Sequence, residues 1–174
     1  KETVDDLRKR GINPPILLRF PQLIVGQVRK LQSAFKKSIK EFDYEGAHMC
    51  VYPMKVNQNR AVIEEYLREG ARYNFGLEAG SSAELYIALA MDQPAGSLLV
   101  LNGFKDEGFI RLAFTGAMAG KNVVIVIEKL SELETTLKIA DEVSKENPED
   151  KLPMIGVRVS GVRGPLPGMA RTGE

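Results

Sequence analysis

The sequence is short of the side chains that make disulfides, histidine metal sites and membrane spans. Its 174 residues include one cysteine, one histidine and no tryptophan. The single Cys50 excludes a disulfide within the chain and is typical of proteins of the reducing cytoplasm. No apolar run approaches the roughly 18 residues that a membrane span needs, and no signal peptide is recognisable. We therefore expect a cytoplasmic protein without a membrane partner.

An excess of either charge is also missing. The chain has 24 lysine and arginine residues against 23 aspartate and glutamate residues, a net charge of +1. Domains that bind nucleic acids usually carry a strong positive charge, so this balance predicts no nucleic-acid partner. With His48 as the sole histidine, we also expect no histidine-based metal site.

Apolar runs alternate with amphipathic segments from residue 49 onward. Five runs have the mostly apolar character of strands buried on both faces, at 49–54, 73–78, 97–101, 122–127 and 154–159. The segments between them begin with residues that cap helices, namely Asn57 or Asn59, Ser81 with Glu84, Asp106, and Ser131 with Glu134. This alternation predicts a parallel sheet covered by helices.

Each predicted strand has a polar residue at or near its end, in order Lys55, Glu78, Asn102, Glu128 and Arg158. Such strands belong either to a doubly wound sheet or to a β/α barrel, and both folds place their sites at the carboxyl edge of the sheet. A closed barrel needs eight strands and about 250 residues. We therefore predict an α/β fold, a partial parallel β/α barrel of the first five or so βα units. The predicted domains are an N-terminal helical segment, 1–46, and the partial barrel, 47–174.

Lys55 follows the first strand at a position where burial would continue, with Val56 beyond it. If the ammonium group is buried, it loses its proton more readily, and the amine becomes a nucleophile for carbonyl cofactors. If Lys55 lies just past the strand end, its amine simply reaches water. The strand alone favours the second interpretation, and the rest of the chain reverses that preference.

Three further residues are candidates for the same site. The glycines around Glu78 predict a close approach of the backbone to a ligand. Arg158 lies in an apolar strand and needs an anionic partner, which Glu78 or Glu128 would supply, either as a structural ion pair or beside a cofactor. Ser81 has a sufficient role as a helix N-cap, and that role is compatible with a cofactor contact.

The segment 51–58, Val-Tyr-Pro-Met-Lys-Val-Asn-Gln, resembles the cofactor-lysine stretch of the biosynthetic arginine decarboxylases. These enzymes belong to the alanine-racemase-like (fold type III) decarboxylases, which depend on pyridoxal phosphate. Further stretches agree in the same order, at 18–21, 75–81, 102–106, 126–129 and 155–158. The resemblance covers nearly the whole chain. Ornithine and diaminopimelate decarboxylases share the lysine followed closely by asparagine, but they are less similar elsewhere.

The resemblance implies pyridoxal 5′-phosphate joined to the amine of Lys55, and decarboxylation of L-arginine to agmatine and carbon dioxide in polyamine biosynthesis, including that of spermidine. Glu78 would orient the lysine amine, and Arg158 would lie beside the cofactor ring. Ser81 and Asn57 are further cofactor-binding candidates. The family is homo-oligomeric, and its bacterial members are usually linked to magnesium (Mg2+), for which this chain offers no assigned ligand.

Several parts that the family uses to hold the cofactor are missing from the sequence. They are the histidine that stacks on the ring, the glycine-rich phosphate loop and the carboxylate that pairs with the pyridine nitrogen. We therefore expect these 174 residues to be inactive alone, as part of a longer enzyme. Two alternatives stay open: a decarboxylase of ornithine, lysine or diaminopimelate, and a non-catalytic barrel protein that binds pyridoxal phosphate.

Overall fold

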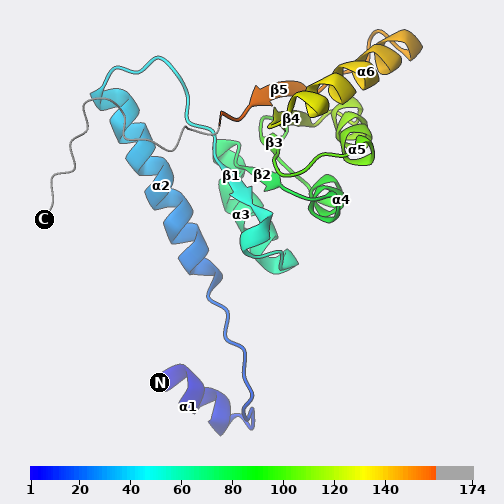
Figure 1. Cartoon of the computed structure of the whole chain (residues 1–174). Helices are drawn as coiled ribbons and strands as arrows, with labels where there is room; N and C mark the ends of the chain where they lie inside the picture. The colour runs from blue at the N-terminus through cyan, green and yellow to red at the C-terminus, as the bar shows by residue number, and fades with distance from the viewer. Residues whose placement is uncertain (160–174) are drawn as a thin grey trace, which may run out of the picture. The chain divides into compact units, whose positions relative to one another are not determined.

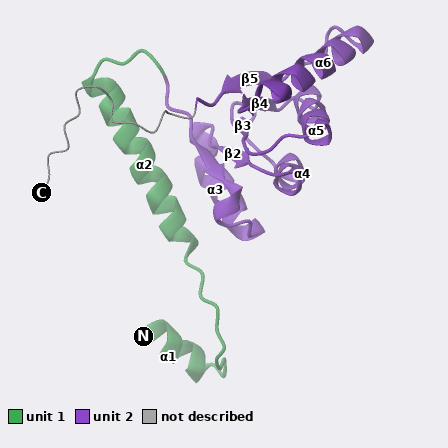
Figure 2. Ribbon diagram, in the orientation of Figure 1, with its two compact units in different colours: residues 1–46 green, residues 47–174 purple. Residues whose placement is uncertain are grey.

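In the computed structural model, which describes residues 1–159, the chain divides into two compact units, Lys1–Gly46 and Ala47–Glu174 (Figure 2). The first unit holds the helices α1 (Glu2–Lys9) and α2 (Pro21–Glu41). Proline suits the first position of α2, because the N–H that it lacks has no partner there in any helix. Among the described residues, no helix has the length and apolar character needed to cross a bilayer.

The second unit is built on five parallel strands, which are β1 (Val51–Pro53), β2 (Gly76–Ala79), β3 (Leu98–Leu101), β4 (Asn122–Ile127) and β5 (Met154–Val157). Their order in the sheet is the order of the sequence. A doubly wound sheet reverses its strand order in the middle, whereas a β/α barrel adds each strand beside the last. The predicted fold, an open part of a β/α barrel, is therefore confirmed.

A helix or turn follows each of the first four strands. The helices are α3 (Arg60–Gly70), α4 (Ser82–Ala90), α5 (Glu107–Met118) and α6 (Leu130–Glu146), and the 3-10 turns are η1 (Met54–Val56) and η2 (Ala71–Tyr73). In Figure 1, α4, α5 and α6 follow one another along one side of the strands. Of the two caps considered for α3, Asn59 is the one observed, and its Oδ1 accepts the N–H of Ala61 at 3.1 Å. The predicted cap Asp106 is confirmed, since its Oδ1 accepts the N–H of Phe109 at 2.8 Å.

The start of α6 differs from the prediction, which placed a capping box at Ser131 and Glu134. The helix begins earlier, at Leu130, and the side chain of Glu132 turns back over its first turn. Glu132 Oε2 accepts the N–H groups of Glu128 at 2.9 Å and Lys129 at 3.3 Å. Glu132 is also buried and lies beside Lys105 from the loop after β3, a tertiary contact that the capping pattern in the sequence does not indicate.

The strands separate the side chains into two faces. The residues of β3 and β4 that are almost fully buried among the helices are Leu99, Leu101, Val123, Ile125 and Ile127, and those between them are only partly buried. Glu78 pairs in register with Val100, and Val100 with Val124, on the partly buried face. Paired residues of a parallel sheet point the same way. Glu78 therefore projects to the face that becomes the lumen of a barrel.

Gly103 lies two residues beyond the end of β3 in a backbone conformation with φ +75°, and a Cβ there would lie 2.3 Å from the carbonyl oxygen of Gly80. Gly120 has a comparable φ of +92°, but a Cβ there would meet nothing within 4 Å. Both positions favour glycine because side chains strain a positive φ. Only Gly103 also lets two loops at the carboxyl edge touch.

We expect Gly103→Ala to destabilise the protein more than Gly120→Ala does. The second change costs only the conformational strain of a side chain at positive φ, on the order of 1 kcal/mol. The first adds a collision with backbone that cannot be relieved by a rotamer change. Urea unfolding of both variants measures the difference, and equal losses would show that the loops tolerate separation at Gly103.

Candidate active site

Lys55 lies in the turn η1, directly after β1. The backbone turns at the strand end, so Met54 enters the core with none of its surface exposed while Lys55 is exposed. The expectation that burial continues to Lys55 is therefore wrong, and its position is the one past the strand end. Within residues 1–159 the amine has no hydrogen bond or ion pair. It stands at the carboxyl edge of the sheet, unengaged by these residues.

Asn57 shapes the loop that follows Lys55. Its side-chain oxygen accepts the N–H of Asn59 at 3.0 Å, and its carbonyl oxygen accepts the hydroxyl of Tyr52 at 3.1 Å. Asn59 in turn caps α3. The oxygen atoms of Asn57 are thus used within the loop, and its side-chain amide nitrogen is the group left for a ligand.

Glu78 is the buried acid of the candidate site. It lies in β2 with 6% of its surface exposed, and its Oε1 accepts a hydrogen bond from Asn102 Nδ2 at 3.0 Å. The other oxygen, Oε2, is buried and has no donor among the described residues. Buried carboxylate oxygens without a donor are rare because desolvation is costly. Glu78 Oε2 therefore marks a place where a donor from outside these residues would fit.

Arg158 and Glu128 form the other half of this edge. Arg158 Nη1 donates to Glu128 Oε1 at 3.4 Å, and the same oxygen accepts the N–H of Gly103 at 3.3 Å. Of the two partners expected for Arg158, the structure selects Glu128. The strand-end residues expected to gather here thus form two contacts, Glu78 with Asn102 and Glu128 with Arg158.

Ser81 acts as the N-cap of α4, where its Oγ accepts the N–H of Glu84 at 3.3 Å. Glu84 does more than a cap requires. Its Oε2 accepts the N–H of Gly80 at 2.7 Å, and its Oε1 accepts a hydrogen bond from Gln58 at 3.2 Å. This buried carboxylate therefore ties the loop after Lys55 to the loop after Glu78. The sequence marks Glu84 only as a capping residue, because its long-range partner Gln58 leaves no local signal.

Sequence reasoning also missed a buried ion pair. Lys105 and Glu132 have 4% and 3% of their surfaces exposed, and Lys105 Nζ lies 3.5 Å from Glu132 Oε2. Lys105 Nζ also donates to the carbonyl of Gly103 at 2.6 Å, while Glu132 Oε1 accepts the N–H of Lys105 at 3.3 Å. The pair thus fixes the loops that carry Gly103 and Glu128. A lysine within a loop and a glutamate in a first helical turn give no sequence signal of this pairing.

The electrostatics of Glu132 follow from these donors. Burial acts to raise the pKa of this carboxyl, but the backbone N–H groups of Glu128, Lys105 and Lys129 and the charge of Lys105 together outweigh it. The pKa of Glu132 is therefore below its ordinary value, and the carboxylate is charged at neutral pH.

Of the two glycines beside Glu78, the structure explains Gly76 by strand packing, and the expected ligand approach at Gly80 stays a prediction. A Cβ on Gly76 would lie 1.9 Å from the carbonyl oxygen of Leu98, so Gly76 is needed for contact with β3 and not with a ligand. A Cβ on Gly80 would meet nothing closer than 3.7 Å. The first glycine is explained by strand packing, which a linear pattern cannot distinguish from a ligand cradle.

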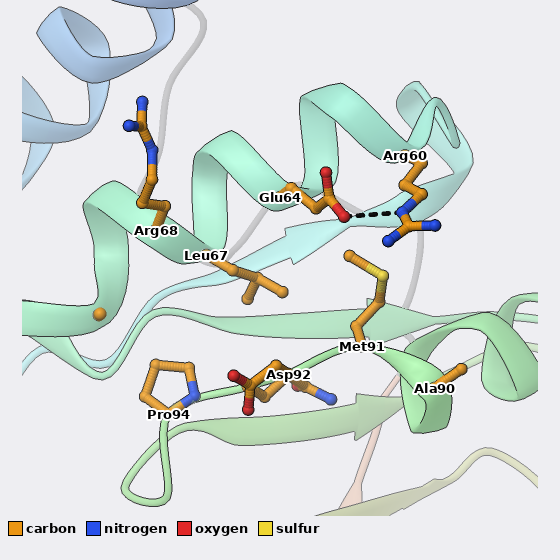
Figure 3. Close-up of a pocket in the computed structure, with 10 residues that line it drawn as sticks. Arg60, Glu64, Leu67, Arg68, Ala90, Met91, Asp92 and Pro94 are labelled. Carbon is orange, nitrogen blue, oxygen red and sulfur yellow. Dashed lines mark hydrogen bonds and ion pairs between the residues drawn. The ribbon is translucent and has the colours of Figure 1, made fainter.

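A hollow of about 650 Å³ lies away from the predicted site residues, between α3 and the segment after α4 (Figure 3). Arg60, Glu64, Met91 and Pro94 are among the residues that line it, and Arg60 is paired with Glu64 at 2.7 Å. None of the five predicted site residues lines this hollow. Among residues 1–159 there is also no group of three or more His, Cys, Asp or Glu side chains arranged to hold a metal.

Comparison with known proteins decides the family. The profile described as pyridoxal-dependent decarboxylase, pyridoxal binding domain, matches residues 25–161, most of the chain. The chain belongs to the pyridoxal-dependent decarboxylases. The match includes the turn that carries Lys55 and the strand-end residues on the lumen side of the sheet.

Individual relatives of this chain carry a narrower name than the family. The biosynthetic arginine decarboxylase of Deinococcus radiodurans is 47% identical over 89% of this chain and 22% of its own length. That of Bacteroides thetaiotaomicron is 40% identical over 91% of this chain and 24% of its own. A crystal structure of the Campylobacter jejuni biosynthetic arginine decarboxylase is 40% identical with a TM-score of 0.78, covering 90% of this chain and 25% of that one. The chain thus spans about a quarter of the length of these relatives.

The geometry suits the cofactor of this decarboxylase family. Pyridoxal phosphate is an aldehyde, and the amine of Lys55, exposed and without a partner among residues 1–159, is the kind of group that condenses with it. Glu78 Oε2 offers a buried acceptor that lacks a donor among the described residues. These two observations fit a cofactor bound at the carboxyl edge of the sheet, where barrels place their sites.

We expect Lys105→Met to destabilise the protein by roughly 3–5 kcal/mol, because it leaves the Glu132 carboxylate buried without its cation. Adding Glu132→Leu removes the second charge and should recover part of this loss. Chemical denaturation of the two single variants and the double variant completes a double-mutant cycle. Strictly additive losses would show that the two charges do not interact.

A second expectation concerns acid. The pKa of Glu132 is lower in the folded than in the unfolded protein, so its charged carboxylate adds to the free energy of unfolding. This stabilisation is fully present above the unfolded-state pKa of about 4.3 and is lost as the pH falls through the folded-state pKa. Glu132→Gln removes this dependence. Urea midpoints measured from neutral pH downward should therefore fall more steeply with acid in the unmodified protein than in the variant, and parallel curves would contradict the assignment.

Proposed function

We propose that this chain carries the cofactor lysine of an arginine decarboxylase that converts L-arginine to agmatine and carbon dioxide in polyamine biosynthesis. The observation that carries the proposal is the similarity to curated biosynthetic arginine decarboxylases, which are between 38% and 47% identical in three of the relatives compared, over about nine-tenths of this chain. The substrate is the finer part of the proposal, because the relatives are about four times as long as this chain.

Lys55 is the residue that would hold pyridoxal phosphate, through its exposed amine at the sheet edge. When bound, this cofactor supplies the electron sink for the electrons released as carbon dioxide leaves. Glu78 would orient the lysine amine. Its Oε2, which accepts no hydrogen bond within residues 1–159, is the acceptor for that task. Arg158 would lie beside the cofactor ring, with Glu128 holding its guanidinium at 3.4 Å.

Ser81 and Asn57 complete the proposed cofactor shell. Both already accept a backbone N–H through a side-chain oxygen. Their contribution to a ligand would therefore come from donors, the hydroxyl proton of Ser81 and the amide nitrogen of Asn57. Donors of this kind suit an anionic group such as a phosphate.

Four further properties belong to the same proposal. They are a homo-oligomer, a role for magnesium, a cytoplasmic location and the division into a helical segment, 1–46, and a partial barrel, 47–174. The location is supported by the single cysteine, and the division by the two compact units. The oligomer and the metal rest on the resemblance to the family.

The substrate is tested with the protein expressed at the full length of its gene and loaded with pyridoxal phosphate. Separate incubations with carboxyl-labelled arginine, ornithine, lysine and diaminopimelate should release labelled carbon dioxide from arginine alone, with agmatine as the second product. Release from ornithine or lysine instead would overturn the substrate assignment. Bound cofactor with no release from any amino acid would support a non-catalytic barrel.

Lys55→Ala should abolish both the visible absorbance of the bound cofactor and its permanent attachment by borohydride, because the variant lacks the amine that reacts with the aldehyde. Lys138→Ala is the matched control, since Lys138 is an exposed lysine on the outer helix α6. The control should keep both signals. If the absorbance persists in Lys55→Ala, another lysine holds the cofactor.

A further inference from the structure

The turn that carries the amine of Lys55 has few stabilising contacts of its own. The turn η1 spans three residues, Met54–Val56, and Lys55 makes no hydrogen bond or ion pair within the described part of the chain. Short 3-10 turns have poor hydrogen-bond geometry of their own. The position of the amine therefore depends on contacts that close the turn from outside.

Tyr52 makes such a contact. It lies in β1 with 6% of its surface exposed, and its hydroxyl donates to the carbonyl oxygen of Asn57 at 3.1 Å. The bond joins a residue three positions before Lys55 to one two positions after it. It thus closes a loop with Lys55 inside.

The direction of the Tyr52 hydroxyl is itself fixed by packing. The ring of Tyr52 is stacked on that of Tyr66 in α3, with centroids 4.2 Å apart and planes inclined by 22°. Tyr66 in turn contacts Phe75 at 5.9 Å between centroids. A ring held between strand and helix in this way has little freedom to move its hydroxyl.

Further bonds extend the closure beyond Asn57. Asn57 Oδ1 accepts the N–H of Asn59, which caps α3, and Gln58 donates to the buried Glu84 at 3.2 Å. The loop is therefore anchored at three successive residues on its far side. Tyr52 provides the anchor that comes from β1, the strand that ends just before the turn.

We propose that Tyr52 is a positioning residue for Lys55. The phenolic hydroxyl of Tyr52 closes the loop 52–57 and so holds the lysine amine at the carboxyl edge of the sheet. The inference deepens the proposed function and rests on Lys55 being the cofactor lysine. Tyr52 keeps its proton throughout and does not touch the reacting atoms. Burial, together with the nearby Tyr66, raises the pKa of Tyr52, so the hydroxyl remains a donor at neutral pH.

The chain offers a matched control for this inference. Tyr66→Phe removes the same oxygen atom from the partner ring of the same stack, and the Tyr66 hydroxyl makes no hydrogen bond within residues 1–159. Tyr52→Phe keeps the ring and removes only the bond to Asn57. The two variants therefore differ in loop closure while sharing the loss of a phenol from the same aromatic stack.

Both variants are made in the full-length protein loaded with pyridoxal phosphate, and circular dichroism shows whether they fold. Tyr52→Phe should lower kcat roughly 5- to 10-fold, the loss expected for one hydrogen bond, with KM for arginine within about twofold. The pH at which the visible absorbance of the lysine-bound cofactor changes should also shift. Tyr66→Phe should leave both readouts at the unmodified values.

Equal kcat and equal absorbance titrations for Tyr52→Phe and Tyr66→Phe would overturn the positioning role. The absorbance titration reports the environment of the lysine nitrogen, so a loss of stability alone does not move it in the folded protein. Failure of the proposed function has a different signature. In that case the unmodified protein binds no cofactor, or Lys55→Ala keeps it, before either tyrosine is examined.

Discussion

The sequential, parallel register of the five strands is the constraint on which the candidate site depends. Because each strand is added beside the previous one, every strand end lies at the same edge, and side chains paired in register share a face. This places Glu78 on the lumen side and lets it reach Asn102 of the next strand end. The contact of Glu128 with Arg158 joins the ends of β4 and β5 in a similar way.

Buried carboxylates organise the loops at this edge. Glu84 and Glu132 each lie in the first turn of a helix and accept the backbone N–H of the residue just before the N-cap, Gly80 and Glu128 respectively. Each also binds a side chain from a neighbouring loop, Gln58 for Glu84 and Lys105 for Glu132. One residue thus serves both helix capping and the placement of site loops, so local structure and site geometry are coupled.

The two principal site residues have opposite environments. Lys55 is exposed on a three-residue turn, whereas Glu78 is buried in a strand with one oxygen lacking a donor in the described chain. An accessible amine can be approached by an aldehyde cofactor, and a desolvated acid gives a strong hydrogen bond to whatever donor arrives. The chain belongs to the pyridoxal-dependent decarboxylases, and the proposed roles of Lys55 and Glu78 use these two environments in different ways.

The parallel α/β fold, the cap Asp106 and the polar side chains at the strand ends could be predicted from the sequence, because they follow from local periodicity and capping preferences. For α3 the sequence narrowed the cap to Asn57 or Asn59, and the structure shows Asn59. The sequence did not determine the exposure of Lys55, which depends on where the backbone leaves β1. Nor did it reveal the Lys105–Glu132 pair or the Tyr52–Asn57 closure. These features depend on how strands, loops and helices pack against one another, and residues far apart in the sequence give no local signal of that packing.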